Sequence, residues 1–91
     1  MSVLLLTYDL NKEPNKHDYN GFYKVRDSYD HVRLSESSYA LNTNESPEAV
    51  YQKVRPYMDE NDYVYVITLR RPYTGYGRKS VNQWLEKNLP R

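Results

Sequence analysis

The sequence of 91 residues contains no cysteine, which excludes disulfide bonds and thiolate zinc sites. It has no apolar run near the roughly 20 residues that a membrane-spanning helix needs. The short apolar segment at the N-terminus lacks the basic start and the small-residue cleavage site of a signal peptide. Because a chain without cysteine fits a reducing compartment, we expect a cytoplasmic protein without a membrane partner.

Glycine is scarce, with three copies, and the net charge is only +1. No phosphate-binding loop and no dinucleotide-binding glycine pattern is present, so a nucleotide cofactor is not expected. Tyrosine is abundant instead, with 11 copies against one phenylalanine. A tyrosine ring can fill a core while its hydroxyl meets water, a partner or a nucleic-acid base. Residues 1–91 predict a single small domain, whose stability would gain from homodimerisation.

Hydrophobic patterning predicts the element order β-α-β-β-α-β-α. The expected strands are Val3–Asp9, His31–Leu34, Ser37–Thr43 and Tyr63–Leu69, where the middle two are either separate strands or one long strand bent at Ser35-Glu36. The expected helices begin at the capping residues Asp18, Ser46 and Ser80. A split β-α-β arrangement of these elements is an α+β, ferredoxin-like βαββαβ sandwich with an additional C-terminal helix. The handedness of parallel crossovers places the first two helices on one face of the sheet.

The second face of this sheet is also apolar. In the last strand Tyr63, Tyr65, Ile67 and Leu69 alternate with valine and threonine, so neither side of the strand is polar. A sheet that is apolar on both faces needs a cover on the side without helices. We expect the C-terminal helix, a second subunit, or both to supply it.

Asp9 stands at the end of the first buried strand, where an acidic side chain is costly to desolvate unless it is paired, hydrogen-bonded or bound to metal. It is therefore either a functional group or a structural cap at the start of the loop. The two histidines, His17 and His31, are candidates for general acid–base chemistry or plain surface residues. No Ser-His-Asp order is visible, which disfavours nucleophilic hydrolysis.

The segment of residues 70–79 carries four basic residues and no acidic one. Arginine and lysine would contact phosphates there while tyrosines stack on bases, in DNA or RNA. The predicted nucleic-acid-binding residues are Arg70, Arg71, Tyr73, Tyr76, Arg78 and Lys79. The alternatives are a solvated loop whose arginines pair with Asp59, Glu60 or Asp62, and a contact between subunits.

Four short motifs occur in a characteristic order: Tyr8-Asp9 at a strand end, the run Leu34-Ser35-Glu36-Ser37-Ser38-Tyr39-Ala40-Leu41 before Thr43, the turn Asp59-Glu60-Asn61-Asp62, and Trp84-Leu85 near the C-terminus. In this order they resemble the motifs of the small CRISPR-associated endoribonuclease-like proteins, a group that includes VapD-like and SinR-like members. The resemblance implies a symmetric homodimer with a ferredoxin-like fold. It also implies a divalent metal, Mg²⁺ or Mn²⁺, at Asp9 and a supporting catalytic serine at Ser37 or Ser38.

The basic residues that this group carries at the start of its first helix are poorly matched here, with Lys16 and His17 the nearest candidates. Many relatives of the group serve as scaffolds without nuclease chemistry, so the fold does not decide the activity. Two hypotheses therefore stand, and whether the protein is an enzyme is open. One is a metal-dependent ribonuclease that uses Asp9. The other is a non-catalytic dimer that binds nucleic acid or a protein partner, as a scaffold or regulator.

Overall fold

The structure is a computed structural model that describes residues 2–11 and 17–91. Within these residues, four strands and three α-helices follow the predicted order, with one short 3-10 helix after the second α-helix. They are β1 (Val3–Asp9), α1 (Asn20–Asp27), β2 (Asp30–Ser35), β3 (Ser38–Asn42), α2 (Pro47–Val54), η1 (Arg55–Tyr57), β4 (Tyr63–Leu69) and α3 (Lys79–Asn88). Most of the loop expected at residues 11–17 lies outside the described residues.

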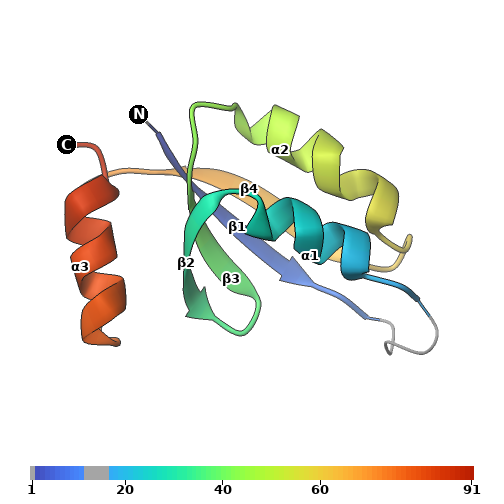
Figure 1. Cartoon of the computed structure of the whole chain (residues 1–91), viewed down its shortest axis with the longest axis horizontal. Coiled ribbons are helices and arrows are strands. Elements are labelled where there is room, and N and C mark those ends of the chain that lie inside the picture. Colours follow the sequence, from blue (N-terminus) through green and yellow to red (C-terminus); the bar gives the residue numbers. More distant parts are fainter. Residues whose placement is uncertain (1, 12–16) are drawn as a thin grey trace.

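The strands of the described chain form a four-stranded antiparallel sheet in the order β2-β3-β1-β4. β3 lies between β1 and β2, and β1 lies between β3 and β4, so each β-α-β unit is split by a strand of the other unit. Figure 1 shows α1 and α2 side by side over one face of the sheet and α3 at one end of the molecule. This arrangement confirms the predicted α+β class and is compatible with a ferredoxin-like plan that carries an added C-terminal helix.

β1 is one of the two interior strands, and its residues are apolar on both faces, as an interior strand requires. It pairs with β4 over its whole length, from Val3 opposite Leu69 to Asp9 opposite Tyr63. On its other side it pairs with β3, where Leu4 lies opposite Leu41. The predicted alternation of side chains in β1 and β4 between the two faces is confirmed by this register.

α2 begins as predicted, since the Ser46 side chain accepts a hydrogen bond from the Ala49 amide and Pro47 occupies the first turn. Glu48 lies in the same turn, where the helix dipole favours a negative charge. Pro56 lies two residues beyond the end of this helix. α2 ends at Val54 and continues as the 3-10 turn η1, because proline cannot supply the amide of another α-helical turn.

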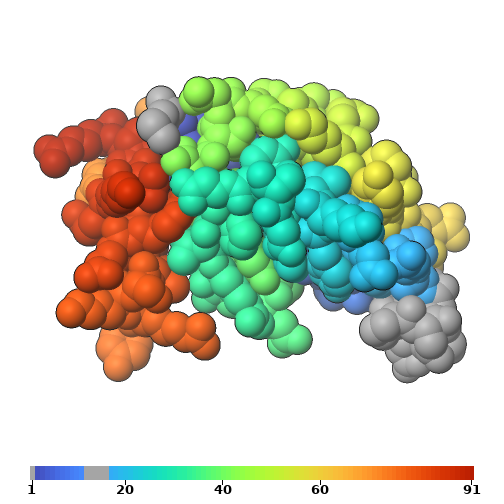
Figure 2. Space-filling model, viewed as in Figure 1, coloured from blue at the N-terminus to red at the C-terminus, as the bar shows by residue number. Residues whose placement is uncertain are grey.

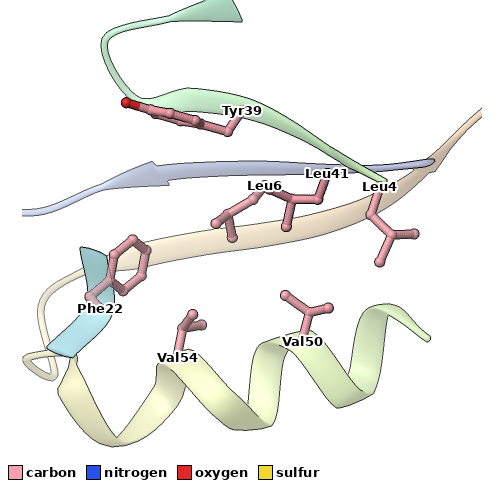
Figure 3. Packing of buried hydrophobic residues seen from close by; sticks show 7 residues of the cluster. All are labelled: Leu4, Leu6, Phe22, Tyr39, Leu41, Val50 and Val54. Carbon is pink, nitrogen blue, oxygen red and sulfur yellow. The ribbon is translucent and has the colours of Figure 1, made fainter. Parts of the chain in front are cut away.

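The main core lies between the sheet and the two helices α1 and α2. Its fully or nearly fully buried side chains come from β1, β3, α1 and α2: Leu4, Leu6, Phe22, Tyr39, Leu41, Val50 and Val54. In Figure 3 the leucines of the sheet face the two valines of α2, while the Tyr39 ring lies along β3. The ring of Tyr8 meets that of Phe22 edge-on, with centroids 4.8 Å apart. Apolar burial on this side therefore fixes both helices against the sheet.

The second face of the sheet is covered only in part. α3 packs over one end of it, where Val3, Ala40 and Leu89 are buried together with Trp84 against them. The exposed stretch is on β4, where Tyr63, Tyr65 and Ile67 keep 63%, 65% and 48% of their surface in solvent. The C-terminal helix is thus one cover of this face, as expected, and it leaves a row of large apolar side chains in solvent.

The start of α3 differs from the sequence expectation. Ser80 was expected to cap the helix, but the helix already begins at Lys79, and Arg78 is its N-cap residue without a side-chain hydrogen bond. The Arg78 carbonyl accepts the amide hydrogen of Asn82, which closes the first turn two residues earlier than a Ser80 cap would. The prediction of Ser80 as the cap is therefore wrong, because Ser80 already lies inside the helix.

Candidate nucleic-acid interface

A groove of about 600 Å³ lies between α3, the segment of residues 70–78 and the end of β2. Figure 2 shows α3 at one end of the molecule beside the β2 and β3 segments that it packs against. Apolar side chains from three elements line the groove: Leu34, Leu69, Val81, Leu85 and Leu89. Polar lining comes from Asn82 and from the basic and aromatic residues described next.

Three arginines line this groove, against one acidic residue, Glu36. Arg70 and Arg78 are exposed, and their side chains have no hydrogen-bond or ion-pair partner among residues 2–11 and 17–91. Arg33 uses its Nε to donate to the Ser35 carbonyl at 3.3 Å, which leaves the rest of its guanidinium available. The groove therefore combines an apolar lining with an excess of positive charge.

Arg71 is used inside the chain. Its guanidinium donates to the backbone carbonyls of Leu89 and Glu86, at 3.3 and 2.6 Å, and to the Glu86 carboxylate at 3.1 Å. The Tyr73 hydroxyl donates to the same carboxylate. Hydrogen bonds from Tyr73 and Arg71 lower the pKa of Glu86, so this carboxylate stays charged. Arg71 thus holds the C-terminal end of α3, while Tyr73 keeps its ring beside the groove.

Among the described residues, no hydrogen bond or ion pair holds the other predicted side chains, which are those of Arg70, Tyr76, Arg78 and Lys79. The Tyr76 ring is fully exposed at the edge of the groove, between Gly75 and Gly77. A Cβ on either glycine would meet nothing within 4 Å, so there is open space beside both residues, although the Asn82 side chain donates to the Gly77 carbonyl at 3.4 Å. Lys79 is exposed at the first position of α3. The structure therefore brings Arg70, Tyr73, Tyr76 and Arg78 together at one groove.

Asp9 lies at the exposed end of β1, and its carboxylate has no hydrogen-bond or ion-pair partner among the described residues. It borders a hollow of about 300 Å³ that Glu36 and Ser37 also line. Ser38 lies on the neighbouring strand, where its hydroxyl is 2.8 Å from that of Thr7. Asp9 and Ser37 are thus brought together, whereas the hydroxyl of Ser38 is already paired.

Arg26 enters the same hollow from α1, and it is a site residue that the sequence alone did not predict. Its guanidinium donates to the Tyr8 hydroxyl at 2.9 Å and to Asp27 at 2.8 Å, and it lies 4.3 Å from the centre of the Tyr39 ring. Burial raises the pKa of Tyr8 even though the bond from Arg26 opposes it. The tyrosines that hold Arg26 come from separate strands, so no local motif could have identified the cluster.

These residues fit a metal ion poorly within one chain. No group of three or more His, Cys, Asp or Glu side chains converges in residues 2–11 and 17–91. The two carboxylates of the hollow, Asp9 and Glu36, share it with the positive charge of Arg26, which opposes a divalent cation. A metal at Asp9 would need further oxygen ligands from water, a bound phosphate or a second copy of the chain.

Both histidines contact backbone carbonyls, and the second ring nitrogen of His31 also lies 3.9 Å from the Asp27 carboxylate, which Arg26 already engages. His17 Nε2 lies 2.9 Å from the Tyr57 oxygen, and His31 Nδ1 lies 2.8 Å from the Tyr29 oxygen. Lys16, the other candidate at the start of the first helix, lies outside the described residues. The histidines thus stabilise the ends of the elements that flank α1.

No protein-family model matches the chain, and no solved structure matches it. Within the part of the chain that the structure describes, no helix combines the length and the apolar character needed to cross a bilayer. The functional argument therefore rests on the residues of the groove and of the Asp9 hollow. These two features meet at Glu36, which lines both.

Proposed function

We propose that the protein is a non-catalytic binder of single-stranded nucleic acid that uses the groove beside α3. The observation that carries this proposal is the set of three arginines, Arg33, Arg70 and Arg78, around an apolar lining. The three arginines would attract the negatively charged phosphates of a strand, and the flat apolar face of an unpaired base would pack on the apolar lining. Tyr73 and Tyr76 would stack on neighbouring bases.

Single strands suit this groove better than a duplex. The bases of a duplex are stacked and paired, so they cannot reach a lining made by Val81 and Leu85 without being unstacked first. A single strand presents its bases at little cost and follows the arginines with its backbone. The proposal covers both RNA and DNA, because the apolar lining offers few groups that would read a 2′-hydroxyl.

The test is fluorescence anisotropy with a short labelled single strand of mixed sequence, as RNA and as DNA, over a series of salt concentrations. We expect the double substitution Arg70→Ala with Arg78→Ala to weaken binding about tenfold or more, since each contact to a phosphate is charge-assisted. The plot of log K against log salt should become shallower by about 1.4, or about 0.7 for each lost contact.

Arg55→Ala is the matched control, because Arg55 is exposed in η1 and does not line the groove. It removes the same charge and should leave binding nearly unchanged. Equal weakening by Arg55→Ala would mean that only the overall charge matters, and the groove would lose its role. Absence of binding by the wild-type protein at low salt would overturn the proposal itself.

A metal-dependent ribonuclease is the second candidate, favoured by the exposed and unpartnered carboxylate of Asp9 beside Ser37. Mg²⁺ or Mn²⁺ would be its cofactor, with further ligands from water, a bound phosphate or a second copy of the chain. Incubation of labelled RNA with and without EDTA tests it, using wild-type protein and Asp9→Ala. Cleavage that EDTA and the substitution both abolish would support the ribonuclease. Cleavage retained by Asp9→Ala would remove this residue from the chemistry.

The proposal includes a homodimer, because Tyr63, Tyr65 and Ile67 form an exposed apolar row that one chain does not cover. A regulatory protein partner on that row is the alternative. The resemblance to CRISPR-associated endoribonuclease-like proteins leads to the same expectation and stays a prediction. A cytoplasmic setting is part of the proposal, since the cysteine-free sequence fits a reducing compartment.

A further inference from the structure

The two edges of the sheet differ in how they are protected against pairing with another chain. At one edge, β2 carries charged side chains, pairs with β3 through a register shift between Arg33 and Ser35, and has α3 packed against it. Charges, irregular pairing and a covering helix are the usual means by which proteins block an edge strand. The β2 edge is therefore closed to a partner strand.

The β4 edge has none of these means. Its seven residues read Tyr-Val-Tyr-Val-Ile-Thr-Leu, without charge, proline or glycine. β4 pairs with β1 in continuous register from Tyr63 to Leu69, and among the described residues no strand pairs with its other side. A long, regular, apolar edge strand of this kind is a template for a further strand.

We propose that β4 pairs antiparallel with β4 of a second copy of the chain, about a two-fold axis at Val66, so that the two sheets become one continuous sheet. This inference rests on the homodimer of the proposed function and assigns the surface where its subunits meet. Val66 is the middle residue of the strand, so an axis there pairs every residue of β4 and leaves no edge amide of the strand unmatched.

The side chains are self-complementary in this register. On the exposed face, Tyr65 lies opposite Ile67 of the second copy and Tyr63 lies opposite its Leu69, which gives aromatic–aliphatic pairs in each case. These pairs involve the three exposed large apolar side chains of the strand. A second copy is favoured over an unrelated peptide because the strand meets its own apolar sequence without a single charge on either side.

Cysteine cross-linking tests the register directly, since the natural chain has no cysteine and any disulfide must join engineered residues. Directly opposed residues of an antiparallel pair have Cα atoms about 4.5–5.5 Å apart, within reach of a disulfide. Val66→Cys should therefore give a covalent dimer under mild oxidation. Thr68→Cys is the matched control on the same face, because its opposite residue is Val64 and two copies of residue 68 stand too far apart.

A second measurement avoids the partly buried position of Val66. Two preparations of different mass, one with Tyr65→Cys and the other with Ile67→Cys, are mixed and oxidised. The expected product is the mixed disulfide, in at least severalfold excess over the two self-linked species, because only residues 65 and 67 lie directly opposite one another. Both side chains are exposed, so neither substitution disturbs the core.

The outcomes separate this inference from the proposed function. Light scattering that shows a dimer, with no cross-linking of Val66→Cys or of the mixed pair above the Thr68→Cys control, overturns the edge pairing and leaves the homodimer standing. Light scattering that shows a monomer at micromolar concentration overturns both. Cross-linking in both experiments, with Thr68→Cys unlinked, establishes the register. Nucleic-acid binding through the groove is measured separately and depends on none of these results.

Discussion

At the residue scale, the carboxylate of Asp62 joins three segments that are distant in the sequence. It accepts hydrogen bonds from the Asn11 amide at 2.7 Å, from the Tyr19 hydroxyl at 2.9 Å and from the Asp59 amide at 2.8 Å. The sequence predicted the turn that contains Asp62. Its partners could not be predicted, because Asn11 and Tyr19 lie 51 and 43 residues away.

Burial alone would raise the pKa of Asp62, but hydrogen bonds from Asn11, Asp59 and Tyr19 outweigh it and lower the pKa. The stabilisation is therefore complete above the unfolded value of about 3.9 and is lost as the pH falls through the lower folded value. Asp62→Asn should destabilise the protein by about 2 kcal/mol at neutral pH.

Urea unfolding of both proteins at neutral and at acidic pH measures this difference. The gap between wild type and Asp62→Asn should shrink as the pH falls below about 4, because the wild-type carboxyl is then protonated as well. A gap that stays constant with pH would show that the charge of Asp62 does not stabilise the fold.

At the element scale, local patterning predicted most of the strands and helices. The alternating faces of β4 and the Ser46 cap of α2 follow from nearest-neighbour chemistry, and both are confirmed. The start of α3 was placed wrongly, since a helix capped by Ser80 would begin two residues later than the observed one. Gly21 lies inside α1, where glycine is unfavourable, but a Cβ there would overlap the Tyr57 ring, so tertiary packing explains this glycine.

The position of α3 depends on Arg71, whose guanidinium reaches Glu86 and the Leu89 carbonyl. We expect Arg71→Ala to weaken the attachment of the helix by about 2 kcal/mol, because carbonyls and a carboxylate lose a charged donor. Amide hydrogen exchange should then accelerate in α3 and stay slow in β3. Arg70→Ala is the control, since that neighbouring side chain has no partner in the described chain. Equal exchange in both variants would contradict the role of Arg71.

At the scale of the whole molecule, the sequence predicted that the sheet is apolar on both faces. It could not predict which part of the second face α3 would cover and which part would stay exposed. That division depends on where α3 packs, which follows from the contacts of Arg71 and Trp84 rather than from any periodic pattern. The groove was foreseen only as a basic loop. Its apolar lining comes from β2, β4 and α3, so it exists only in the folded chain.

A dimer has a thermal midpoint that depends on concentration, because association stabilises the folded chains by mass action. We expect the Tm to rise by about 3 °C for each tenfold increase in protein concentration, as the size of the chain implies. Differential scanning fluorimetry over a range of concentrations measures it. A Tm that stays constant over two decades would identify a monomer, and Ile67→Lys, which places charge on the exposed row, should abolish the dependence.

The single tryptophan of the chain, Trp84, lies on α3, and its indole Nε1 approaches the Asp30 carboxylate at 3.4 Å. The main core between the sheet and the other two helices contains tyrosines and a phenylalanine but no indole. Fluorescence excited selectively at the indole therefore reports the docking of α3 on the sheet. Far-ultraviolet circular dichroism reports the secondary structure of the whole domain, which is dominated by the sheet with α1 and α2. The natural sequence thus carries an intrinsic fluorophore on the helix whose other residues line the groove, and ligands that tighten or release this helix can be followed without a label.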